Sequence, residues 1–127
     1  MKVTVVALTL ILSLTLPHVA LADSDKEYLP IVKVQPVYPR RALMRGVTGW
    51  VVLEFTVNEM GAVENPVVVE NCGWTQKGTC ENSPNDVFDS SAKKAALKFK
   101  YIPKVVDGQA VSTPGVRNTL TFELVSE

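Results

Sequence analysis

The chain has 127 residues with 13 basic and 13 acidic side chains, which is the length of one small domain and a neutral formal charge. A chain with this balance has no excess of positive charge to bind the phosphates of a nucleic acid, so we expect no nucleic-acid partner. The single histidine, His18, lies near the N-terminus. If that region is removed, the remaining chain cannot build a Ser-His or Cys-His nucleophile.

Residues 1–22 have the pattern of a secretory signal peptide. Lys2 precedes an apolar run from Val3 to Leu16, and Ala20-Leu21-Ala22 fits a small-residue cleavage site. The run is shorter than the about 20 apolar residues of a membrane span. We therefore expect cleavage after Ala22, export to the periplasm and no remaining membrane span, with an uncleaved anchor as the alternative. Residues 23–30 are predicted to be a flexible N-terminus, and residues 31–127 one domain.

Export would permit a disulfide between Cys72 and Cys80, the two cysteines of the chain. A ring of this size stabilises a fold by roughly 2.5 kcal/mol in the chain-entropy model. A redox or metal pair is the alternative. However, the spacing is not C-x-x-C, and no other thiol or mature histidine could complete a site. The sequence predicts a structural disulfide, no metal site and no cofactor.

An extended segment and a short helix begin the domain. In Gln35-Pro36-Val37-Tyr38-Pro39, the residue before each proline is biased towards the β or polyproline region. Pro39 suits the first turn of a helix over Arg40–Arg45, and Gly46 suits its C-terminal end.

Two strands are predicted next. Trp50–Asn58 alternates apolar and polar side chains, and Gly61 supplies a hairpin turn. The second strand covers about Ala62–Glu70, and Pro66 within it requires either a bulge or a solvent-facing position. Residues 71–84 read as a polar loop that holds both cysteines.

A second helix and a last strand complete the pattern. Phe88, Ala92, Ala95 and Phe99 form one buried helical stripe, and Asp107-Gly108 is a turn. The strand Val116–Leu124 places Arg117, Thr119 and Thr121 on its outer face. Its inner face carries Val116, Leu120, Phe122 and Leu124. These elements predict an α+β fold, a small three-stranded antiparallel sheet with two helices on one face.

The order and spacing of these motifs resemble the TonB C-terminal domain family. The likeness spans about Ile31 to Val125, nearly the whole mature chain. The matching residues are Gln35, Pro36, Tyr38, Pro39, Ala42, Gly46, Gly49-Trp50-Val51, Phe55, Val57, Gly61, Phe88-Asp89, Ala92, Ala95, Phe99, Tyr101, Pro103, Asp107-Gly108, Val111 and Phe122-Glu123-Leu124.

The resemblance implies a peptide partner. TonB domains bind the TonB box, a short peptide of outer-membrane transporters, which adds as a strand beside the last strand while the QP-x-YP segment helps to hold it. The strand Val116–Leu124 contains no Pro or Lys to protect an open edge, whereas Pro66 partly protects the second strand. The candidate peptide-binding residues are Gln35, Pro36, Tyr38, Arg117, Thr119 and Thr121.

Structural explanations compete with these assignments. The QP-x-YP segment could simply lead rigidly into the helix, with Tyr38 packed on the core. Arg117, Thr119 and Thr121 could form an ordinary solvated sheet face. Trp74 could recognise a ligand or cover a small apolar cluster.

One motif hints at catalysis. Ser91 with Lys94, and Ser90 with Lys93, have the S-x-x-K spacing of penicillin-recognising enzymes. No S-D-N or K-T-G element accompanies them, and the domain is too small for that cleft. We expect no enzyme.

The leading hypothesis is a periplasmic TonB-like module that binds a TonB-box peptide by strand addition and contributes to transport. The alternative is a structural module that forms homodimers or joins an envelope complex through the same edge. A third hypothesis is a minimal energy transducer whose N-terminal segment is not cleaved and anchors it in the membrane. The lack of a Pro-rich spacer argues against this hypothesis. The few residues between Ala22 and the domain reach only about 30 Å.

Overall fold

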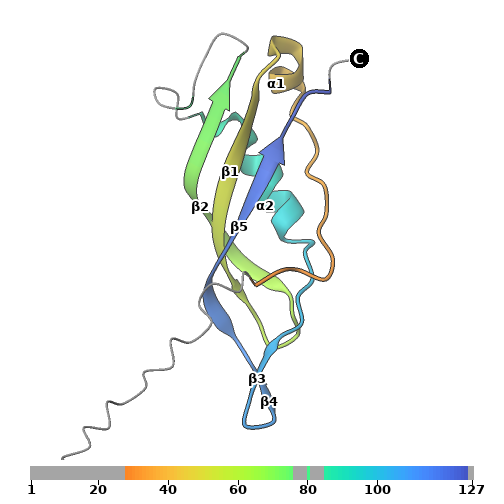
Figure 1. The fold of residues 1–127 in the computed structure, drawn as a ribbon, viewed down its shortest axis with the longest axis vertical. Helices are drawn as coiled ribbons and strands as arrows, with labels where there is room; N and C mark the ends of the chain where they lie inside the picture. The colour runs from red at the N-terminus through yellow and green to blue at the C-terminus, as the bar shows by residue number, and fades with distance from the viewer. Residues whose placement is uncertain (1–27, 76–79, 81–84, 126–127) are drawn as a thin grey trace, which may run out of the picture.

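The computed structural model describes residues 28–75, 80 and 85–125 (Figure 1). The expected signal peptide, residues 1–22, lies outside this range. The predicted flexible N-terminus is described only from Tyr28 onwards. No helix within the described residues is long and apolar enough to cross a membrane. The elements are α1 (Arg40–Arg45), β1 (Thr48–Val57), β2 (Val63–Trp74), the 3-10 turn η2 (Asp86–Phe88), α2 (Asp89–Ala96), β3 (Lys104–Val106), β4 (Gln109–Val111) and β5 (Thr113–Phe122).

The predicted fold class is confirmed. β2, β1 and β5 form an antiparallel sheet in that spatial order, so β1 is central and β5 lies at an edge. The helices lie behind one face of the sheet, and the other face is open in Figure 1. β3 and β4 form a separate hairpin. Of this hairpin, only the turn at Asp107-Gly108 was predicted.

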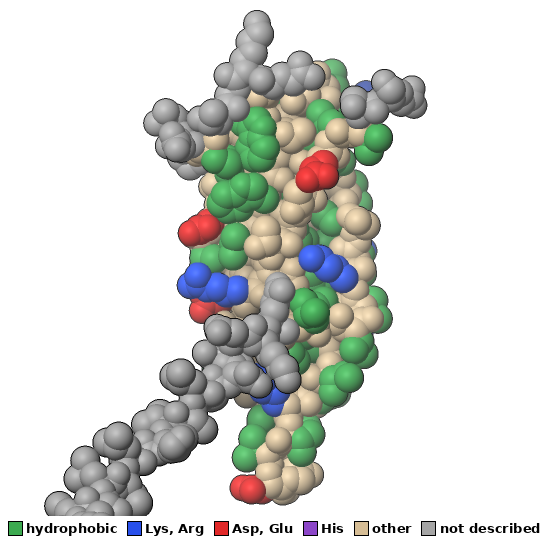
Figure 2. Space-filling model, viewed as in Figure 1, with side chains coloured by type: hydrophobic (Ala, Val, Ile, Leu, Met, Phe, Trp, Pro, Cys, Tyr) green, Lys and Arg blue, Asp and Glu red, His purple; other side chains and the backbone are tan. Residues whose placement is uncertain are grey.

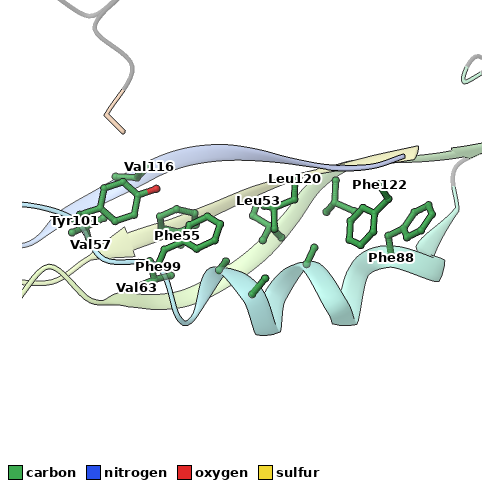
Figure 3. Close-up of a cluster of buried hydrophobic side chains, with 14 of the residues drawn as sticks. Leu53, Phe55, Val57, Val63, Phe88, Phe99, Tyr101, Val116, Leu120 and Phe122 are labelled. Atoms are coloured by element: carbon green, nitrogen blue, oxygen red, sulfur yellow. The ribbon is translucent and has the colours of Figure 1, made fainter. Parts of the chain in front are cut away.

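The core lies between the sheet and α2 (Figure 3). Its inner sheet residues come from alternating positions of β1 and β5, as a two-residue strand period requires. Phe88 and Phe122 stack with their ring centroids 4.2 Å apart at one end of the core. Phe55 and Tyr101 meet at the other end, with centroids 5.8 Å apart.

β2 is longer than the sequence indicated. It continues to Trp74, so the prediction of a loop from Asn71 is wrong for residues 71–74. These residues pair with the first part of β1, and the Asn71 amide donates to the Asp89 carboxylate. The polar composition of residues 71–74 suggested a loop, but these residues belong to a strand, and the side chain of Asn71 bonds to α2. The bulge that Pro66 requires is present, since the register shifts there and Asn65 has φ of 52°.

The last two predicted boundaries also shift. α2 ends at Ala96, and Phe99 is buried beyond it through a turn. β5 runs from Thr113 to Phe122, and Leu124 is 36% exposed rather than inward-facing. The chain leaves the sheet after Phe122. Beyond that residue, the alternation of side chains along a strand no longer predicts which of them are buried.

The structure joins Cys72 and Cys80 by a disulfide, with their Cα atoms 5.5 Å apart. Cys72 is buried and pairs across the sheet with Trp50. Because paired residues project to the same side of a sheet, the bond lies on the face opposite the helices. It ties the end of β2 to the connection before η2.

Candidate functional site: the free edge of β5

β5 pairs with β1 on one side only, which leaves its other side open. In an antiparallel pair, the N–H and C=O of one residue point to the same side of the strand. The carbonyl oxygen of Thr119 accepts a bond from the Lys33 ammonium, away from β1. By the two-residue repeat, Arg117, Thr119 and Thr121 therefore direct their backbone groups to the free edge. Arg117, Thr119 and Thr121 were predicted as site residues because their side chains face outward. Their backbone N–H and C=O groups also face the open edge of the sheet.

The N-terminal segment, residues 28–39, runs beside this edge (Figure 1). Within the described chain, no backbone hydrogen bond joins it to β5. It is attached at both ends instead. Near its start, Val32 and Lys100 exchange two backbone hydrogen bonds, of 3.1 and 3.0 Å. Near its end, the Ser91 hydroxyl donates to the Val37 carbonyl. The middle of the segment is thereby held next to β5 without pairing with it.

Two depressions lie between the N-terminal segment and β5, and together we call them the edge groove. The first has a volume of about 340 Å³ and is lined by Gln35, Pro36, Tyr38, Thr121, Phe122 and Glu123. The second, of about 280 Å³, is lined by Lys33, Val34, Gln35, Pro36, Thr119, Leu120 and Thr121. The two share the side chains of Gln35, Pro36 and Thr121, so they form one elongated site along the strand.

Tyr38 anchors one end of the edge groove. Its hydroxyl donates to the carbonyl of Val47, which links the N-terminal segment to the residue preceding β1. Its ring packs edge-on against Phe88 and Phe122, with centroids 5.6 and 5.8 Å away. Burial raises the pKa of the Tyr38 hydroxyl, so the group stays protonated and able to donate at neutral pH. Tyr38 thus packs on the core, which the alternative structural explanation of the QP-x-YP segment predicted, and it also lines the groove.

Tyr28 and Asn118 fix the other end. The Tyr28 hydroxyl donates to the Ile102 carbonyl, and its ring lies 4.9 Å from that of Tyr101. Asn118 is 5% exposed and projects from β5 into the core side. Its amide donates to the Tyr101 hydroxyl at 3.3 Å, and its oxygen accepts from the Lys33 ammonium at 3.1 Å. A partly buried chain of polar contacts therefore links the N-terminal segment, β5 and the connection after α2.

Five of the six candidate residues lie together at the edge groove: Gln35, Pro36, Tyr38, Thr119 and Thr121. The side chain of Arg117 does not line it. Arg117 instead forms an ion pair with Glu54 of β1, at 3.2 Å. Lys33 was missed by the sequence analysis. Its position two residues before Gln35 was the available signal, but only the parallel course of the segment beside β5 shows that it reaches Thr119.

The S-x-x-K motif has a structural role here. The Ser91 hydroxyl is engaged with the Val37 carbonyl. Lys94 lines a small depression of about 110 Å³ between α2 and the N-terminal segment. Ser91 of this motif therefore helps to hold the segment that borders the edge groove.

Trp74 lies away from the edge groove. It pairs with Thr48 at the end of β2, next to the disulfide. Register places it on the open sheet face with Trp50 and Val52. Figure 2 shows hydrophobic side chains gathered over the upper part of β1 and β2 on that face. This position agrees with a Trp that covers a small apolar cluster.

A three-stranded antiparallel sheet, with an extended segment attached beside the open edge of β5, defines a small α+β domain. The chain belongs to the family described as Gram-negative bacterial TonB protein C-terminal, whose model matches residues 34–124. The TonB protein of Pseudomonas aeruginosa is 32% identical over 97 residues, 76% of this chain and 25% of that protein. The TonB protein of Vibrio cholerae is 30% identical over 88 residues, 69% and 32% of the two chains.

Solved structures agree with this membership. The solution structure of the Pseudomonas aeruginosa TonB C-terminal domain matches with a TM-score of 0.58 and 26% identity, over 82% of this chain and 93% of that one. The TonB2 protein of Vibrio anguillarum matches with a TM-score of 0.53 and 36% identity, over 81% and 87%. The chain spans about a quarter to a third of the length of the curated relatives that it matches.

Proposed function

We propose that this chain is a periplasmic TonB-like module that binds an extended peptide, the TonB box of an outer-membrane transporter, by strand addition at β5, and so contributes to transport. The observation that supports this most is the free edge of β5 with the edge groove beside it. Main-chain hydrogen bonds would supply affinity, and the groove lining would supply selectivity.

The N-terminal segment beside β5 favours a single extended chain over a second domain. The N-terminal segment borders the groove and is attached at both ends through Val32 and Val37. A second copy would have to bring its own sheet, and its own N-terminal segment, into the same space. A lone peptide strand brings only its side chains, which alternate between the open sheet face and the groove. Self-association through the same edge therefore requires the N-terminal segment to move.

Binding should be tested by titrating the labelled domain with synthetic transporter peptides and following amide chemical shifts. We expect changes along residues 117–123 and at Gln35, with a monomer in sedimentation. Thr119→Pro removes an edge N–H without removing a bond to β1 and should abolish binding. Thr119→Val keeps the backbone donor at the same position and changes only the side chain, so it should lose far less affinity than Thr119→Pro. No shift changes, together with a stable dimer, would favour the self-association function instead.

Export is part of the same proposal. Cleavage after Ala22 would leave Asp23 as the mature N-terminus and no membrane anchor. Mass spectrometry of the protein recovered from the periplasm measures this directly. A retained N-terminal segment of full mass would instead support the minimal-transducer alternative.

A further inference from the structure

We propose that the outer side of α2 is a docking surface for an anionic phospholipid membrane; this inference goes beyond peptide binding and does not depend on it. α2 covers the sheet face opposite the open one (Figure 1). Its buried side consists of alanines, and its exposed side recurs at i, i+3, i+4, i+7 and i+8. This exposed set, which we call the outward stripe, consists of Ser90, Lys93, Lys94, Leu97 and Lys98.

The three lysines of the outward stripe have no ion pair among the residues that the structure describes. Lys93 follows Asp89 by one helical turn, which is the spacing of a helical ion pair. The Asp89 carboxylate instead accepts from the Asn71 amide at 3.2 Å. Lys94 and Lys98 are one turn apart, and like charges at that spacing lower stability. An external anion between them would relieve this repulsion.

The neutral formal charge of the chain conceals a separation of charge between its two faces. The outward stripe carries three lysines and no acidic side chain. On the other side of the domain, register places Glu54 and Glu70 on the open sheet face. Because the local field depends on where charges lie and not only on their sum, the α2 side attracts anions.

Apolar surface among these lysines favours a membrane over an acidic protein. Leu97 is 50% exposed and lies between Lys94 and Lys98. The same two lysines line the depression of about 110 Å³ beside the N-terminal segment, together with Val34 and Val37. Helices that lie at a membrane surface combine lysines with apolar side chains in this way. The ammonium groups would contact lipid phosphates, while Leu97 and Val37 would contact the acyl boundary.

Sedimentation of the mature protein with lipid vesicles tests the inference. We expect binding to vesicles that contain phosphatidylglycerol, none to pure phosphatidylcholine, and weaker binding as salt is raised. The double variant Lys94→Gln with Lys98→Gln should bind about thirtyfold more weakly, as expected for the loss of two cations at a lipid surface. The control Arg45→Gln with Lys104→Gln removes the same charge from α1 and β3, and should lose less than about threefold, because screening limits distant charges.

A third variant separates a membrane from a soluble polyanion. Leu97→Gln keeps all three lysines but loses apolar contact, and should weaken vesicle binding about fivefold. Equal losses in the double variant and its control, or no effect of Leu97→Gln, would overturn the inference. Equal binding to both kinds of vesicle would also overturn it. Binding to polyglutamate without binding to anionic vesicles would instead indicate an acidic protein. Peptide titration without vesicles measures the proposed function separately.

Discussion

The ring of Tyr38 packs edge-on against Phe122 of β5, with the two centroids 5.8 Å apart. This contact joins the N-terminal segment to the strand whose free edge it borders, although the two share no backbone hydrogen bond in the described chain. The Tyr38 hydroxyl adds a second attachment through the carbonyl of Val47. The wall of the edge groove therefore depends on one aromatic side chain.

Substitutions at Tyr38 should separate these two attachments. Tyr38→Phe loses only the hydrogen bond and should lower the free energy of unfolding by about 1 kcal/mol. Tyr38→Ala also removes the ring contacts and should cost about 3 kcal/mol. Urea denaturation of the two variants measures the difference. Equal losses would mean that the ring does not hold the segment.

The contact between the turn after β1 and the connection after α2 can be tested by substituting Gly61, with Gly108 as the control. Gly61 has φ of 79°, and a Cβ there would lie 2.0 Å from the carbonyl oxygen of Tyr101. Gly108 has a similar φ of 80° at the tip of the β3–β4 hairpin, with nothing within 4 Å of its Cβ position. Gly108→Ala should cost about 1 kcal/mol for the left-handed backbone alone. Gly61→Ala should cost more than about 3 kcal/mol, because the backbone must also move.

Thermal denaturation of the two variants provides the comparison, with each acting as the control for the other. Comparable melting temperatures would contradict the close approach of Tyr101 to Gly61.

Reduction of the disulfide should destabilise the domain without changing the edge groove. Cys72 and Cys80 are 8 apart in sequence, and a loop of this length corresponds to roughly 2.5 kcal/mol. The bond lies beyond β1 from β5, on the open sheet face. The double variant Cys72→Ser with Cys80→Ser should therefore unfold at lower urea but bind peptides with an unchanged dissociation constant. A large loss of affinity in the folded double variant would link the loop to recognition.

The strand positions and the partner edge could be predicted because they depend on local patterns. Alternation in Trp50–Asn58 and at Arg117–Thr121 follows from the two-residue period of a strand, and the structure has that alternation. The order of the motifs along the chain, together with the QP-x-YP motif, was enough to predict the family. Five of the six predicted site residues meet at one groove for the same reason, since both segments were read as extended.

The remaining features depend on contacts between distant residues. The last part of β2 looks like a loop until Asn71 is seen to bond Asp89. Lys33 looks like an ordinary surface lysine until its segment is placed beside Thr119, which is 86 residues away in the chain. Arg117 was assigned to the site by alternation, and its ion pair with Glu54 could not be read from either strand alone.

Amide hydrogen exchange along β5, with and without peptide, tests the free edge most directly. In the free domain, the amides of Asn118, Leu120 and Phe122 should exchange slowly, and those of Arg117, Thr119 and Thr121 quickly. At a peptide concentration of 100 times Kd, the second set should slow by about a hundredfold. Protection of all six amides in the free domain, or no change at Thr119 and Thr121 with bound peptide, would contradict strand addition at this edge.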